Sequence, residues 1–151
     1  MNQIQQILYL YDRAMTEDSD AVWKVLDGVD AASAGKQLPG IHSIWQLVQH
    51  MAFWEDVGRR RFSGPFDPDL AGNFPPASKL DESSWRETLA EFRSSNADFR
   101  EELSKLDPAR LDELTPGGQC SFLYEAASVI QHHVYHAGQI VLLKKAGLST
   151  K

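Results

Sequence analysis

The chain has 151 residues, of which 42% are hydrophobic and 24% are charged, and it contains a single cysteine. This size and composition favour one globular domain with its own core and argue against intrinsic disorder. Because Cys120 stands alone, an internal disulfide and a cysteine-rich zinc finger are excluded. The sequence has neither a secretory leader pattern nor an apolar run of about 20 residues, so we expect a cytoplasmic protein outside the membrane.

The net charge is −6, from 15 lysines and arginines against 21 acidic residues. An acidic surface repels phosphate backbones, which makes nucleic acid a poor partner. Two short basic clusters, Arg59-Arg60-Arg61 and Lys144-Lys145, fall where helices are expected to end. Cations at that position complement the helix dipole, and a site for an anionic ligand is the alternative.

Apolar residues recur at helical spacing along most of the chain. Over residues 2–29 they predict one long helix, kinked or broken near Ser19, where a polar run interrupts the apolar stripe. Residues 30–40 are expected to form a connection that closes on the turn pair Pro39-Gly40.

The second helix is predicted from Ser43 to Arg61. Ser43 and Gln46 form a capping-box pattern, which satisfies free amides at the start of a helix. Residues 63–79 form a long loop that holds four of the seven prolines. Such a loop is either a lid or binding loop, or a crossover between two parallel helices.

The third and fourth helices complete the pattern. Ser84 and Glu87 form a second capping-box pattern. One seam then recurs at steps of three and four, interrupted by Asn96, which either fixes register or faces a site. This seam consists of Trp85, Leu89, Phe92, Asn96, Phe99, Leu103 and Leu106. After a loop at residues 107–118, the fourth helix is predicted over residues 121–146, with Gly147 as its stop. Four amphipathic helices of this length predict an antiparallel bundle.

The histidines are unevenly distributed, because three of the five, His132, His133 and His136, lie within five residues. His132 and His136 are one helical turn apart on an apolar face, so both imidazoles can share one metal ion inside a bundle. His50 shares the core-facing side of the second helix and is a better third ligand than His42, which lies in a capping region. The alternative is a set of hydrogen-bonded core histidines.

The residues around these histidines restrict which reactions a metal site here could carry out. In HExxH proteases a glutamate follows the first histidine, but here His133 occupies that position, which excludes their mechanism. His133 itself is expected at a flank or an interface. Candidates to accept a proton from a ligating ring are Gln46, Glu55 and Glu125, each of which is otherwise an exposed helix residue. Cys120 is interpreted as a packing residue rather than a reactive thiol.

Two segments resemble the DinB/YfiT-like family of metal-dependent enzymes. HSIWQLVQHMAFWE (residues 42–55) resembles the second-helix signature of the family, and QHHVYHAGQI (residues 131–140) is similar to its fourth-helix His-x-x-x-His pattern. Carried over by position, the family's metal ligands are His50, His132 and His136. Many members have arginine after the last histidine, where this chain has Ala137.

The resemblance implies a single DinB-like domain over residues 1–151, folded as an all-α four-helix bundle with up-down-down-up topology. It implies a divalent zinc- or nickel-like ion, a small-molecule substrate and a homodimer. Family members of known activity include S-transferases that use bacillithiol, mycothiol or glutathione, and a thiol-dependent isomerase. The expected function is therefore metal-dependent transfer of a low-molecular-weight thiol to an electrophile. A metal-dependent hydrolase and a non-catalytic metal-binding or interaction bundle are the alternatives.

Overall fold

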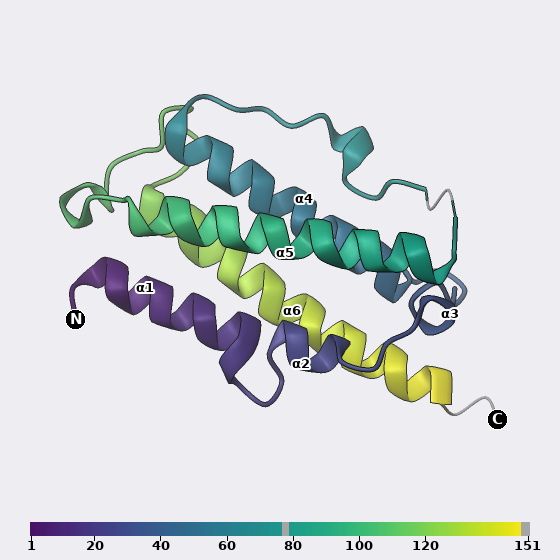
Figure 1. Ribbon diagram of the computed structural model, residues 1–151. Coiled ribbons are helices and arrows are strands. Elements are labelled where there is room, and N and C mark those ends of the chain that lie inside the picture. Colours follow the sequence, from purple (N-terminus) through teal and green to yellow (C-terminus); the bar gives the residue numbers. More distant parts are fainter. Residues whose placement is uncertain (77–78, 149–151) are drawn as a thin grey trace.

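The computed structural model describes residues 1–76 and 79–148, and within these ranges the chain is helical with no strand (Figure 1). Short elements lie between the long helices: α2 (Val22–Leu26), α3 (Ala31–Ala34) and single turns at 70–72 and 108–110. The long helices are α1 (Gln3–Asp12), α4 (Ile44–Ser63), α5 (Glu82–Ser104) and α6 (Phe122–Leu148).

The long helices pack against one another side by side. Helix α4 contacts α5 and α6, and α1 contacts the same two helices. Figure 1 shows that the connection after α4 runs back along the molecule, so that α4 and α5 point in the same direction. The proline-rich loop after α4 is therefore a crossover between parallel helices, in agreement with one of the two interpretations of the sequence.

The first predicted helix is divided in the structure. Helix α1 continues into a π-helical turn over Arg13–Glu17, where the amide of Asp18 donates to the carbonyl oxygen of Arg13 at 3.1 Å. The Asp18 carboxylate also pairs with the Arg13 guanidinium. The chain is then non-helical until α2 begins at Val22, which is fully buried. The break predicted near Ser19 thus turns the chain so that α2 can bury its own apolar residues.

The helix ends agree in part with the predicted caps. Ser43 and Gln46 form the expected capping box of α4. Helix α5 begins earlier than expected, because the Asp81 side chain, rather than that of Ser84, accepts from a first-turn amide, at 2.9 Å. The predicted stop at Gly147 is also wrong, since α6 continues to Leu148.

The hydrophobic core takes residues from all the long helices and from α2 and α3, and it is rich in aromatic side chains. Gly58 permits the close approach of α4 to α6, because a Cβ atom there would lie 3.0 Å from Val129 and 3.1 Å from Phe99. The faces that bear His50 and His132 are thereby held against each other. The largest fully buried apolar side chains of the core are Trp85, Phe92, Phe99, Met51, Leu103 and Ile140.

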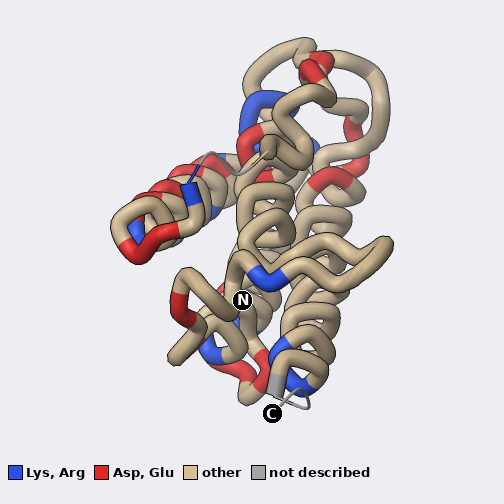
Figure 2. The backbone as a smooth tube through the Cα atoms, turned by 90° about the vertical axis from the view of Figure 1, so that its right-hand side faces the viewer, with Lys and Arg blue, Asp and Glu red and all other residues tan. Residues whose placement is uncertain are grey.

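Charged residues are distributed over the described backbone with both signs interspersed, and Figure 2 shows no broad region that is basic alone. None of the described helices is long and apolar enough to cross a membrane.

Candidate metal centre

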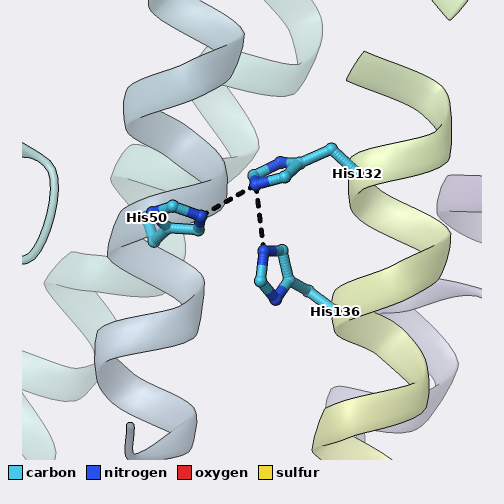
Figure 3. Close-up of side chains that lie close together, drawn as sticks. All are labelled: His50, His132 and His136. Carbon is cyan, nitrogen blue, oxygen red and sulfur yellow. Dashed lines mark hydrogen bonds between the residues drawn. The ribbon is translucent and has the colours of Figure 1, made fainter. Parts of the chain in front are cut away.

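Three imidazoles from two helices converge at one point (Figure 3). His50 projects from α4, and His132 and His136 project from successive turns of α6. The Nε2 atom of His132 lies 2.8 Å from that of His50 and 2.9 Å from that of His136. One nitrogen from each ring lies within 4.8 Å of the other two, which is close enough to hold one metal ion. The structure thus brings together the three residues that the sequence analysis selected.

The outer nitrogens of two rings are bound by side-chain amides. The Nδ1 atom of His50 is 2.6 Å from Oδ1 of Asn73, and the Nδ1 atom of His136 is 2.6 Å from Oε1 of Gln139. An amide oxygen accepts a hydrogen bond, so each Nδ1 carries the proton. In a neutral imidazole the other nitrogen is then a bare lone pair. Both bare Nε2 atoms face His132.

The ring of His132 cannot satisfy both neighbours. It has one proton to donate, so at least one of its two Nε2 contacts sets a lone pair against a lone pair. Its own Nδ1 is buried and has no hydrogen-bond partner within residues 1–76 and 79–148. A cation among the three Nε2 atoms would turn this repulsion into coordination. The arrangement therefore fits a metal ion bound by three imidazoles.

A proton does not supply that positive charge near neutral pH. Burial lowers the pKa of His50 to about 4, with the repulsive charge of His136 contributing. Burial likewise lowers the pKa of His132 to about 3, and the pKa of His136 is also lowered by burial. Neutral imidazoles are the form that binds metal. Zinc and similar divalent ions take three histidine ligands and keep a position for water or substrate.

The crossover loop contributes to the trio in a way that the sequence analysis missed. Asn73 binds the His50 ring, as described above, and Phe74 stacks on the same ring with centroids 4.2 Å apart. His42 stacks on the other face of Phe74 at 3.8 Å. His42 therefore lies beside the trio without belonging to it. Gln139 was detectable from sequence, because it follows His136 by three residues on the same helix face, whereas nothing local connects Asn73 to His50.

His133 is not at a flank or an interface, contrary to expectation. It is 0% exposed, and its Nδ1 donates to the carbonyl oxygen of Val129 at 2.7 Å. Its Nε2 lies 3.4 Å from Oε1 of Glu55, which is also 0% exposed. The side chain next to His132 in sequence thus points into the core rather than toward the trio.

Glu55 is neither exposed nor a partner of His50, so both sequence-based interpretations of this residue are wrong. Its carboxyl group accepts hydrogen bonds from the Tyr11 hydroxyl at 2.5 Å and from the Asn96 amide at 2.6 Å. Asn96 also accepts from the Trp23 indole at 2.8 Å. Burial raises the pKa of Glu55 to about 7 and lowers that of His133 to about 4, which favours a neutral pair. We call Tyr11, Glu55, Asn96 and His133 the core polar cluster.

The other two candidate partners of the ligating rings also lie elsewhere. Gln46 completes the cap of α4. Glu125 is buried, accepts from the Cys120 thiol at 3.1 Å and pairs with Arg61 at 3.5 Å. Burial raises the pKa of Cys120 to about 11, so its thiol is protonated near neutral pH, in agreement with a packing role.

The comparisons with known proteins support the resemblance. Many family members have arginine at the position of Ala137. In this chain Ala137 is buried and packs into the core. A search of curated proteins gives no match. The family model of the DinB superfamily matches residues 14–140, which include both histidine segments. The chain therefore belongs to the DinB superfamily.

Proposed function

We propose that the chain binds one divalent zinc- or nickel-like ion through Nε2 of His50, His132 and His136. The observation that carries this proposal is the convergence of three Nε2 atoms that one proton cannot satisfy. The side chains of Asn73 and Gln139 hold two of the rings with their lone pairs inward. Such outer contacts orient the rings and raise their basicity toward a metal.

The reaction that we propose is transfer of a low-molecular-weight thiol, of the bacillithiol, mycothiol or glutathione type, to an electrophile. A divalent ion with an open position supplies a Lewis acid that lowers the pKa of a thiol. The thiol loses its proton to solvent water, its sulfur forms a bond to the electrophilic carbon, and the leaving group departs with the electron pair of the broken bond. The contacts of Asn73 and Gln139 keep the rings of His50 and His136 oriented during this step, and burial keeps the three imidazoles neutral.

The chain's own residues favour a thiol that comes from outside. Cys120 precedes α6, whose first residue Phe122 lies about 15 Å of helix before His132. Its thiol is held by Glu125 and has a raised pKa. A metal-dependent hydrolase is less well supported, because a metal-bound water benefits from a nearby carboxylate base. The candidate metal-binding group found within the described ranges consists of histidines alone, and Glu55 is committed to the core polar cluster.

Metal analysis of the untagged protein tests the site. We expect about one equivalent of zinc or nickel in the wild type and loss of that metal in His50→Ala, His132→Ala and His136→Ala. The control His42→Ala removes a histidine that stacks beside the trio and should retain the metal. Retention of stoichiometric metal in all three ligand variants would contradict the assignment.

A second experiment tests the reaction. Bacillithiol, mycothiol and glutathione are each offered with 1-chloro-2,4-dinitrobenzene, and product formation is followed by absorbance. We expect product with at least one thiol, and we expect removal of the metal to abolish it. A metal-loaded protein that turns over none of the three thiols would instead support a non-catalytic metal-binding bundle.

Further properties are proposed from the family resemblance. We propose that residues 1–151 form a single up-down-down-up bundle domain and that the protein is a cytoplasmic homodimer. The opposite directions of α1 and α4 and the parallel course of α4 and α5 support the topology (Figure 1). Light scattering tests the homodimer, and a monomer at micromolar concentration would contradict it.

A further inference from the structure

An apolar cavity of about 480 Å³ adjoins the histidine trio. It lies between the turn at residues 38–42, Leu47 of α4 and the last turns of α6. Apart from His42 and Gln139, its described lining residues are glycine, alanine or larger aliphatic residues, and none of them is charged. The turn depends on Gly40, whose φ of 73° is unfavourable for other residues. A cavity of this size accommodates a small organic molecule.

The two polar residues of the cavity both connect to ligand rings of the trio. Gln139 accepts from His136, and its oxygen is thereby engaged at 2.6 Å. His42 reaches His50 through the stacked ring of Phe74. The polar part of the cavity is thus the part nearest the proposed metal, and the remainder is apolar.

We propose that this cavity binds an uncharged, largely apolar molecule that carries an acceptor oxygen, such as a carbonyl or nitro group. Taken together with the proposed function, on which this assignment rests, the molecule is the electrophile that receives the thiol. A charged group in the cavity would lose hydration without gaining an ionic partner. Because the oxygen of Gln139 is engaged by His136, the amide offers its NH₂ group as donor, which calls for an acceptor on the ligand.

The thiol itself is a poorer occupant of the cavity. Glutathione and bacillithiol carry carboxylates, and mycothiol is rich in hydroxyl groups, so an aliphatic lining matches none of them. The mouth of the cavity carries Ile41 and Leu142, which are 52% and 68% exposed. An apolar ligand would cover both side chains and remove apolar surface from water.

Binding of a matched pair of probes tests the inference. The probes are 2,4-dinitrotoluene, which is neutral and has no leaving group, and 2,4-dinitrobenzoate, in which a carboxylate replaces the methyl group. We expect dinitrotoluene to bind the zinc-loaded protein at least tenfold more tightly by calorimetry. Its amide chemical-shift changes should fall on residues 38–47 and 139–146. Equal affinity for the two probes, or shift changes confined to other regions, would overturn the proposal.

A variant pair adds a second test. Leu142→Glu places a charge at the mouth and should weaken dinitrotoluene binding at least tenfold, whereas Leu123→Glu alters an exposed leucine of α6 outside the cavity and should change it less than twofold. Unchanged binding in Leu142→Glu would overturn the proposal. A second result would also overturn it: the wild type is a dimer, Leu142→Glu is a monomer, and neither of the two binds dinitrotoluene. The face would then be an interface between copies of the chain.

The two proposals fail in different ways. If the protein retains zinc and transfers a thiol, but Leu142→Glu leaves the KM for 1-chloro-2,4-dinitrobenzene unchanged, the cavity assignment fails and the proposed function stands. If dinitrotoluene binds with the expected charge preference but no thiol is transferred, the ligand class of the cavity is supported and the proposed transferase reaction fails.

Discussion

His132 and His133 are neighbours on α6, yet they belong to two different polar regions. His132 is half-buried and directs its Nε2 toward two other bare imidazole nitrogens. His133 is fully buried and donates to a backbone carbonyl, with the carboxyl group of Glu55 on its other side. A turn of about 100° per residue separates their directions, so adjacent residues face different surroundings.

The difference between the two regions lies in where the hydrogen bonds go. In the core polar cluster, Tyr11 and Asn96 donate to Glu55, and Nε2 of His133 is the one buried side-chain polar atom of these four residues that has no hydrogen-bond partner among the described residues. In the trio, the outer nitrogens of His50 and His136 donate to the side-chain oxygens of Asn73 and Gln139, and the ring of His132 has at most one proton for the two inner lone pairs that face it. We therefore expect the core polar cluster to act on the stability of the fold and the trio to act on the proposed binding of a metal ion.

Removal of a trio ring should have the largest effect, and it should act on metal affinity. We expect His132→Ala to weaken zinc binding at least 1000-fold, which corresponds to about 4 kcal/mol. The free energy of unfolding of the metal-free protein should change little, because the lost ring has repulsive neighbours. Competition with a chromophoric chelator and denaturant unfolding measure the two quantities. A stability loss in the metal-free variant as large as the loss in binding would remove the distinction between the regions.

The neighbouring substitution should show the opposite pattern. We expect His133→Ala to lower the free energy of unfolding by about 2–4 kcal/mol, because it leaves a cavity in the core and a buried carboxyl group without its neighbour. Zinc stoichiometry should remain near one. Urea unfolding and metal analysis measure the two quantities. Loss of zinc from a folded His133→Ala variant would contradict the assignment of His133 to the core polar cluster.

Glu55 should make a contribution of its own to the pH dependence of the unfolding free energy. Its pKa is raised to about 7 in the folded state, so the folded protein binds more protons than the unfolded chain between about pH 4.5 and 7. Its contribution is therefore present at low pH and is lost as the pH rises through 7. Histidines with lowered pKa values, such as His133, oppose this trend, because they destabilise the fold as the pH falls.

Glu55→Gln isolates this contribution. The difference in unfolding free energy between the wild type and the variant should increase in favour of the wild type by about 2 kcal/mol from pH 7.5 to pH 5. Denaturant unfolding at several pH values measures it in metal-free protein, which avoids changes in zinc affinity. A difference that is constant with pH would show that Glu55 has the same protonation state in the folded and unfolded protein.

The smallest expected effect concerns the amides that hold the rings. We expect Asn73→Ala to weaken zinc binding about tenfold, because His50 loses the acceptor that fixes its tautomer. Asn73→Asp should restore the affinity, since a carboxylate accepts the same hydrogen bond. Competition with a chelator measures both variants. Asp67 is an exposed residue of the same loop, so Asp67→Ala is the control and should leave the affinity unchanged. Failure of Asn73→Asp to recover would indicate that Asn73 acts only by packing.

Much of the trio could be predicted because its spacing is local. The separation of His132 and His136 by one turn, and the core-facing position of His50 between Leu47 and Trp54, follow from helical periodicity. The cap at Ser43 is local as well, because the groups that form it lie within one turn. The contact between His136 and Gln139 is local for the same reason, because the two residues lie three positions apart on α6.

The other features depend on contacts that no local pattern contains. Asn73 meets His50 only because the crossover loop returns along α4 (Figure 1). Glu55 and His133 looked like helix-surface residues, since periodicity alone did not reveal that α1 and α5 would bring Tyr11 and Asn96 against them. The start of α5 at Glu82 was missed because two acceptable N-caps, Asp81 and Ser84, lie within three residues, and the structure uses Asp81.

The sequence by itself determined that the chain is helical and which three histidines face a common interior, because helix formation and its periodicity are local properties. The resemblance to the DinB family came from the two segments at residues 42–55 and 131–140. Tertiary structure alone decided that His133 turns into the core, that Glu55 is buried beside it, and that Asn73 and Phe74 cover His50. These outcomes depend on how helices far apart in the sequence pack, because that packing decides whether an imidazole faces other imidazoles, as His132 does, or a buried carboxyl group, as His133 does.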